Sequence, residues 1–153
     1  MQFDIDTRVT GVKKAVSRLT AMQARAQVFT PVLLKAKKEI QLANASNFAT
    51  NGLPVGGWSP LSPAYAAWKM ARFPGAPPMV QTGRLFASLT GATASFETMT
   101  NTSISIGTSV EYAKFHQYGT TKMPKRKIVF EPPLFAKKLG ADSLNWISNG
   151  EIL

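Results

Sequence analysis

The chain has 153 residues, no cysteine and one histidine, and 18 lysines and arginines against 8 acids give it a net charge of +10. Without cysteine it can form no disulfide framework and no thiolate metal site. No stretch reaches the roughly 20 apolar residues of a membrane span. Length and a 44% apolar composition favour one globular domain over residues 1–153. The basic excess favours a polyanionic partner such as nucleic acid, and a purely solubilising role for the charge stays open.

The N-terminal third is expected to be mainly helical. Residues 2–6 alternate as in a short half-buried strand, and residues 10–26 show the spacing of an amphipathic helix. Its apolar positions are Val12, Val16, Leu19 and Met22. Thr30 and Pro31 form a cap followed by proline at the first helical position, so a second helix should run from 30 to about 50. We expect these two long helices to pack on a sheet.

Residues 51–80 are predicted to form a long loop that takes part in assembly. The stretch holds six prolines and four glycines, and loops of this length in compact domains usually serve function. Within it, Ser62 and Pro63 repeat the cap-plus-proline signal and predict a short helix to about Arg72. Trp58 and Trp68 are anchors of the kind enriched in interface cores. For Trp58, burial in the core of its own domain remains an equal alternative.

The remaining residues predict a small, mainly antiparallel sheet with further helices, and thus an α+β fold. A helix from 81 or 82 through Leu89 precedes a hairpin whose strands lie at 92–97 and 103–106. A short helical segment ends at Gly119, a residue suited to the left-handed conformation. The last predicted elements are a third strand at 128–130, a helix at about 134–147 and a loosely held end at 148–153.

The sequence carries no recognisable catalytic constellation. His116 is the single imidazole, no Gly-x-Ser-x-Gly turn presents a serine, and no glycine-rich phosphate loop is present. The acids form no cluster with ligand spacing. We therefore predict no catalytic residue, no metal and no cofactor, with a small hydrolase that uses His116 as a rival hypothesis.

A basic cluster follows the short helical segment. Lys122, Lys125, Arg126 and Lys127 lie within six residues beside Tyr118. Such a cluster can contact phosphates without reading a nucleotide sequence. A solvated surface is an equally simple interpretation.

Three segments, in this order, resemble the virion morphogenesis (tail-completion) proteins of tailed bacteriophages. The first is a Trp-x-Pro-Leu-Ser entry to a short helix, the second a Thr-Gly-x-Leu helix start, and the third a Tyr-Ala-x-x-His-Gln-x-Gly pattern followed by Met-Pro-x-Arg. The matching residues are Trp58, Pro60, Leu61, Ser62, Thr82, Gly83, Arg84, Leu85, Tyr112, Ala113, His116, Gln117, Gly119, Met123, Pro124 and Arg126.

The resemblance implies a structural subunit of a head–tail connector or tail-completion ring, assembled in the host cytoplasm and located in the tail or neck of the virion. It implies a homo-oligomer, with a hexamer expected, and contacts with head-closure, tail-tube or tail-terminator proteins. The expected subunit-interface residues are Trp58, Leu61, Tyr65, Trp68, Tyr112, His116, Tyr118, Met123 and Arg126. The expected DNA-facing residues are Lys122, Lys125 and Lys127.

Two points stay open at this level. Arg126 has a second candidate role, a bidentate pair with a carboxylate of a neighbouring subunit. The alternative function is that of a basic, sequence-independent DNA-binding protein.

Overall fold

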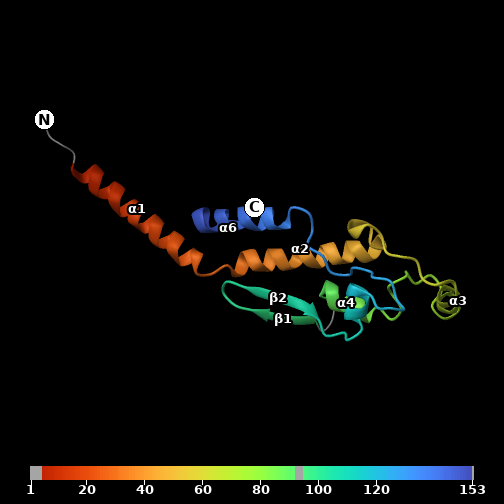
Figure 1. Ribbon diagram of the computed structural model, residues 1–153. Coiled ribbons are helices and arrows are strands. Elements are labelled where there is room, and N and C mark those ends of the chain that lie inside the picture. Colours follow the sequence, from red (N-terminus) through yellow and green to blue (C-terminus); the bar gives the residue numbers. More distant parts are fainter. Residues whose placement is uncertain (1–4, 92–94, 153) are drawn as a thin grey trace. The chain divides into compact units, whose positions relative to one another are not determined.

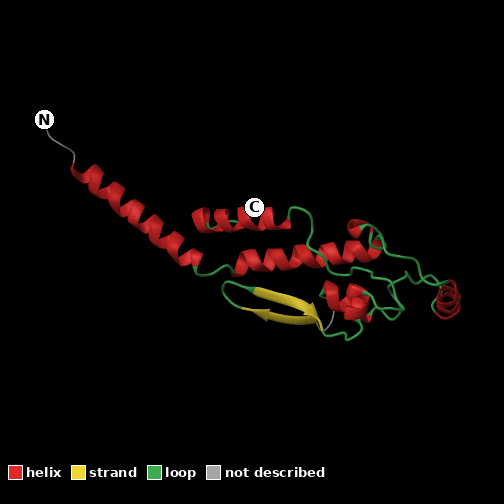
Figure 2. Cartoon of the chain, in the orientation of Figure 1, coloured by secondary structure: helices red, strands yellow, loops and turns green. Residues whose placement is uncertain are grey.

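The computed structural model describes residues 5–91 and 95–152, and it confirms the α+β class in this part of the chain (Figures 1 and 2). The elements are α1 Ile5–Ala26, α2 Thr30–Ala49, the 3-10 turn η1 Leu53–Val55, α3 Pro63–Arg72, α4 Arg84–Thr90, β1 Ser95–Met99, β2 Ile104–Thr108, α5 Ala113–Tyr118 and α6 Phe135–Asn149.

The chain divides into two compact units, and the prediction of a single domain stays a prediction. The first unit comprises Met1–Ala36, Met99–Ser103 and Leu134–Leu153. The second comprises Lys37–Thr98 and Ile104–Pro133. Each unit is described by itself.

In the first unit, α1 packs against α6 through its C-terminal end. The Arg25 guanidinium donates to the Ile147 carbonyl at 2.9 Å, and the Trp146 indole N–H donates to the Val28 carbonyl at 2.8 Å. An ion pair of 2.7 Å joins Lys35 to the buried Asp142. Arg25 and Trp146 thus join the C-terminal end of α1 to α6, and the Lys35–Asp142 pair joins α2 to α6.

The N-terminal strand prediction is wrong where it can be compared with the structure. Positions 5 and 6 belong to α1, which begins five residues earlier than expected, and residues 1–4 lie outside the described part. The pattern of alternation at 2–6 overlaps the start of a helical repeat, and the longer repeat determines the local conformation.

The second unit holds the main apolar core. Its buried side chains are Phe48, Met79, Leu85, Leu89, Val110, Ala113 and Ile128. The predicted hairpin is confirmed in the described residues as the antiparallel pair of β1 and β2, while positions 92–94 of its first predicted strand lie outside the described part. Helix α4 packs against β2, and Lys37 of α2 pairs with Glu97 of β1 at 2.6 Å.

The third strand predicted at 128–130 is wrong. In the described chain the sheet has two strands, and residues 124–134 are drawn as loop (Figure 2). Ile128 is nevertheless 1% exposed. Of the three β-prone residues only Ile128 is buried, and side chains rather than a neighbouring strand hydrogen-bond the backbone at 128 and 129.

The Pro/Gly-rich stretch 51–80 is largely folded. It contains η1 and α3, and α3 starts as predicted with the Ser62 hydroxyl accepting from the Tyr65 backbone N–H at 3.4 Å. At the other end, the buried ammonium of Lys69 donates to the carbonyls of Pro77 and Pro78. Burial lowers the pKa of Lys69 below its usual value.

Candidate functional site

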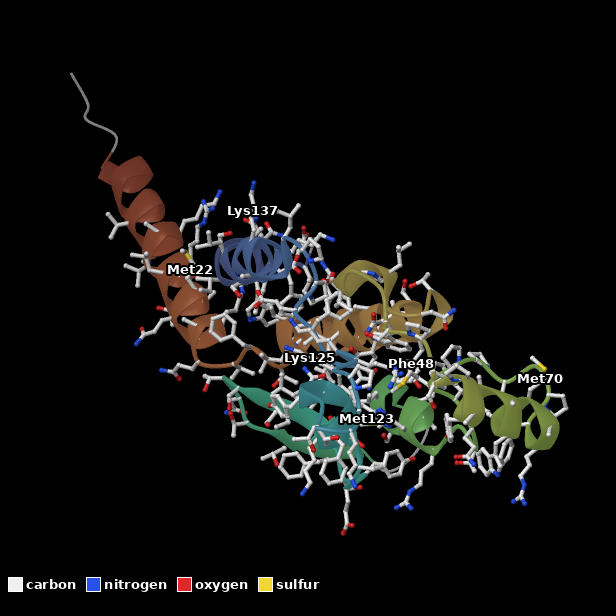
Figure 3. All side chains as sticks on the ribbon, turned by 45° about the vertical axis from the view of Figure 1, so that its right-hand side comes forward. Met22, Phe48, Met70, Met123, Lys125 and Lys137 are labelled. Carbon is white, nitrogen blue, oxygen red and sulfur yellow. The ribbon has the colours of Figure 1, made fainter. Side chains whose placement is uncertain are left out.

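A cavity of about 550 Å³ lies in the second unit. Its lining is mostly apolar and aromatic, and it comes from the 51–80 stretch, the start of α4, α5 and the segment after α5. The lining residues are Pro60, Leu61, Ser62, Tyr65, Pro78, Met79, Gln81, Thr82, Gly83, Arg84, Leu85, Phe86, Tyr112, Phe115, His116, Lys122, Met123, Pro124 and Arg126. Figure 3 labels Met123 in the segment after α5.

The three segments singled out in the sequence meet at this cavity. The first contributes residues 60–62, the second residues 82–85, and the third contributes Tyr112, His116 and Arg126 among others. The first segment ends at Ser62 and the last begins at Tyr112, so 49 residues separate them in the chain. The sequence pattern therefore corresponds to one place in the folded second unit.

Arg126 holds one wall of the cavity in place. It is 4% exposed, and its guanidinium donates to the Ser59 and Pro60 carbonyls, each at 2.8 Å. Its own backbone N–H donates to the His116 carbonyl at 2.8 Å. Burial lowers the pKa of Arg126 from its usual value. Because Lys69 holds Pro77 and Pro78 in the same way, two buried cations fix the wall formed by the 51–80 stretch.

His116 is a packed imidazole inside this cavity. Burial, and then the nearby charge of Arg126, lower the pKa of His116 below its ordinary value. Its ring stands edge-on to Tyr112 with 6.0 Å between centroids. Its Nδ1 is buried and has no hydrogen-bond partner within the described residues. A neutral imidazole fits this position, because a protonated ring would bury a second N–H beside the charge of Arg126.

The charge of the cavity has one sign. Arg84, Lys122 and Arg126 line it, and none of the described lining residues is an acid. Aromatic and apolar walls with cations favour an apolar segment that carries a negative group. The arrangement is suited to docking another protein segment.

Five of the predicted site residues lie outside the lining. Trp58 packs edge-on against Phe48 with centroids 5.2 Å apart, and its indole N–H donates to the Lys127 carbonyl at 2.9 Å. Trp58 is thus partly buried and packs against the core of the second unit, while its place in a subunit interface stays a prediction. Trp68 is half-exposed and stacks on Tyr65 at 5.4 Å. The others are Tyr118, Lys125 and Lys127, all exposed.

The structure also adds residues that were not among the predicted site residues. Met79, Phe86 and Phe115 line the cavity. Of these, Phe115 is spaced along the helix with Tyr112 so that both lie on one face. No sequence pattern placed Met79 and Phe86 at the site, because the residues that they contact depend on how residues 76–83 fold back.

The basic segment after α5 is exposed at its lysines. Lys125 (labelled in Figure 3) and Lys127 point into solvent, while Lys122 lies at the cavity. No carboxylate pairs with Arg126 among the hydrogen bonds of the described residues, which go to Ser59 and Pro60. The guanidinium of Arg126 is thus engaged within its own chain.

No group of three or more metal-binding side chains occurs in the described residues, and no described helix has the length and hydropathy needed to cross a membrane.

Comparison with known proteins gives one match. The model of a family described as the phage virion morphogenesis family matches residues 7–134, which include all three segments at the cavity. No curated protein and no solved structure matches the chain.

Proposed function

Since this chain belongs to the phage virion morphogenesis family, we propose that it is a structural subunit of the ring that completes a bacteriophage tail and joins it to the head. The family gives the chain a role in the structure or assembly of a phage virion. Its place in the tail or neck, the homo-oligomeric ring and the expected hexamer are the proposed part.

The observation that carries the proposal is the convergence of the family segments on one open, preformed cavity. A surface that is already ordered favours docking, because ordering a loop on association costs free energy. Here Arg126 and Lys69 already hold the loop wall. We propose that the cavity receives an apolar, acidic segment of a neighbouring ring subunit or of a head-closure, tail-tube or tail-terminator protein.

Aromatic side chains around the cavity supply the apolar contact area. Tyr65, Tyr112 and Phe115 line it and are 42%, 41% and 45% exposed. Half-exposed aromatic rings of this kind lose their remaining water contact when a partner covers them, which favours association. Tyr118 is 77% exposed and does not line the cavity.

The experiment compares Tyr112→Asp with Met70→Asp. Met70 is 74% exposed on α3 and does not line the cavity, so it is a matched control. For the wild-type chain, native mass spectrometry and electron microscopy should show a closed ring, and purified particles of the parent phage should contain the chain. Tyr112→Asp should leave a folded chain that fails to form the ring or enter particles, whereas Met70→Asp should assemble. Normal assembly of Tyr112→Asp would contradict the proposal.

A second candidate is a basic, sequence-independent DNA-binding protein, favoured by the exposed Lys125 and Lys127 in a chain of net charge +10. In the ring proposal these lysines face DNA in transit and bind it weakly. The discriminating measurement is duplex binding by the isolated chain at several salt concentrations, with the double variant Lys125→Glu and Lys127→Glu. Tight binding with a steep salt dependence that the variant abolishes would favour this second candidate.

A further inference from the structure

The cavity in the second unit carries positive charge that the described residues leave without a counter-charge. Arg126, which is 4% exposed, lines it with Arg84 and Lys122, and none of the described lining residues is an acid. The guanidinium of Arg126 donates to the carbonyls of Ser59 and Pro60, which are dipoles without a net charge. Buried cations are usually paired with an anion. A carboxylate on the occupant would therefore complete the cavity.

Most acids of this chain are unsuited to supply that carboxylate, because a cation lies near them. Six of the eight acids have a lysine or arginine within four positions of the sequence: Asp4, Asp6, Glu39, Glu111, Glu131 and Asp142. A further acid, Glu97, pairs with Lys37 at 2.6 Å. A segment that carries its own cations is repelled by the like charges of the cavity.

Glu151 is the remaining acid, and no cation lies near it in the sequence. The nearest one, Lys138, stands 13 positions earlier. Ile152 and Leu153 follow Glu151, so residues 151–153 join a negative charge to two large apolar side chains. This segment has the composition that the cavity favours, an apolar stretch with a negative group.

The described hydrogen bonds hold this segment to the first unit at one point. Gly150, with a φ of +79°, ends α6 just before it. The Glu151 carbonyl accepts from Asn145 Nδ2 at 3.1 Å. Within the described part of the first unit, the Glu151 carboxylate has no hydrogen bond or ion pair. Because one hydrogen bond contributes little net stability, the segment can exchange this contact for a better one.

The size and the walls of the cavity suit a short apolar segment. Its volume of about 550 Å³ lies within the range of roughly 300–1,000 Å³ that is typical of sites enclosing a small ligand. Tyr65, Tyr112 and Phe115 are half-exposed in its lining. An isoleucine side chain placed against these rings removes apolar surface from water on both sides, which favours binding.

We infer that the cavity of one copy of this chain binds residues 151–153 of a second copy, with Glu151 facing the cations and Ile152 facing the aromatic wall. The inference rests on the homo-oligomeric ring of the proposed function. The segment and the cavity are different surfaces of the chain, so each copy gives one segment and receives one. Such a head-to-tail contact closes into a ring when its rotation allows.

The charge pairing is tested by reversal. Glu151→Lys should raise the chain concentration needed for ring assembly about tenfold, because it places a cation against Arg84 and Lys122. Glu131→Lys is the matched control, since it makes the same change of charge at another exposed acid. Adding Lys122→Glu to Glu151→Lys should restore assembly, because the pair forms again with its signs exchanged. Native mass spectrometry measures assembly, circular dichroism checks the folding of each variant, and equal assembly of Glu151→Lys and Glu131→Lys would overturn the inference.

Cysteine pairs test the occupant directly, because the chain has no native cysteine. Met123 lines the cavity, whereas Met70 is 74% exposed outside the lining. Ile152→Cys on one chain should form a disulfide with Met123→Cys on another about tenfold faster than with Met70→Cys, as expected from a raised local concentration. Equal rates would overturn the inference. A chain with both Ile152→Cys and Met123→Cys that links only within itself would overturn it in favour of the segment of the same chain.

Two further outcomes separate this inference from the proposed function. If a chain that lacks residues 151–153 assembles a normal ring, the inference is overturned and the ring proposal stands. If the wild-type chain forms no ring, yet Ile152→Cys and Met123→Cys link two chains preferentially, the ring proposal is contradicted and the contact between two copies is supported.

Discussion

Gln117 hydrogen-bonds both backbone groups of Val129: its Nε2 donates to the Val129 carbonyl at 2.9 Å, and its Oε1 accepts from the Val129 N–H at 3.0 Å. The same Oε1 accepts from the Ile128 N–H at 2.9 Å. A single side-chain amide thus makes the contacts that an adjacent strand would make. This explains how Ile128 can be buried without belonging to the sheet.

Replacing Gln117 should therefore destabilise the second unit. Gln117→Leu keeps the size of the side chain but removes the acceptor of the Ile128 and Val129 N–H groups, and an unpaired group at the buried Ile128 costs about 1–3 kcal/mol. We expect the free energy of unfolding to fall by about 2 kcal/mol, measured by urea denaturation. Gln117→Glu retains the acceptor and loses the donor, so its loss should be smaller.

Tyr118→Ala, one position further along the chain, is the control for Gln117. Tyr118 is 77% exposed, and exposed substitutions usually change stability by less than about 0.5 kcal/mol. Equal losses for Gln117→Leu and Tyr118→Ala would show that the amide contributes nothing.

The sequence predicted local structure well where caps and turns determine it. The start of α3 at Ser62 and Pro63, the end of α5 at Gly119 and the hairpin are confirmed. Each depends on residues adjacent in sequence: a capping hydroxyl, a glycine with φ of +77°, a turn. These signals act over a few residues and need no tertiary information.

The errors lie where distant residues decide the structure. Ile128 to Phe130 have strand propensity, but the side chains of Gln117 and Asn47 hydrogen-bond the backbone of this segment in place of a neighbouring strand. The sequence indicated the lining residues only through the family pattern. It could not predict that they enclose a cavity, because the wall is held by the hydrogen bond from Arg126 to Ser59.

Trp58 is expected to act mainly on stability. A Cβ added at Gly52, whose φ is +82°, would lie 2.3 Å from Trp58 Cδ1, so the ring fits closely against this turn. Trp58→Ala removes the contact with Phe48 and should lower the free energy of unfolding by about 3 kcal/mol. Thermal and urea denaturation of the full chain provide the measurement.

Trp58→Phe isolates the polar part of this contact. It keeps an aromatic ring near Phe48 and loses the indole N–H that donates to the Lys127 carbonyl, so a loss of about 1 kcal/mol is expected. If Trp58→Ala retained wild-type stability and only weakened subunit association, its side chain would belong to an interface.

Arg126 is expected to keep the cavity wall in place through its planar guanidinium. Arg126→Lys preserves the charge but cannot reproduce two N–H donors aimed at Ser59 and Pro60. Limited digestion with chymotrypsin should then cut faster near Tyr65, because the wall opens more often. Arg84→Lys, an exposed arginine of the same cavity, should leave the cleavage rate unchanged. Identical cleavage of both variants would contradict the role of Arg126.

His116 should make the stability of the second unit depend on pH. Burial, and then the charge of Arg126, lower the pKa of His116 in the folded chain, whereas the unfolded chain has the ordinary value of about 6.5. Between these two pKa values the unfolded state binds more protons, so the free energy of unfolding falls as the pH drops below about 6.5 and levels off below the folded pKa.

The measurement compares urea denaturation of wild type and His116→Gln between pH 7.5 and 5. The wild type should lose stability relative to the variant as the pH falls, and other groups cancel in the difference. Because His116 is the one histidine of the chain, its ring resonance can also be titrated directly by NMR. A midpoint at or above 6.5 in the folded chain, or identical pH profiles for the two proteins, would refute the burial of a neutral imidazole at the cavity.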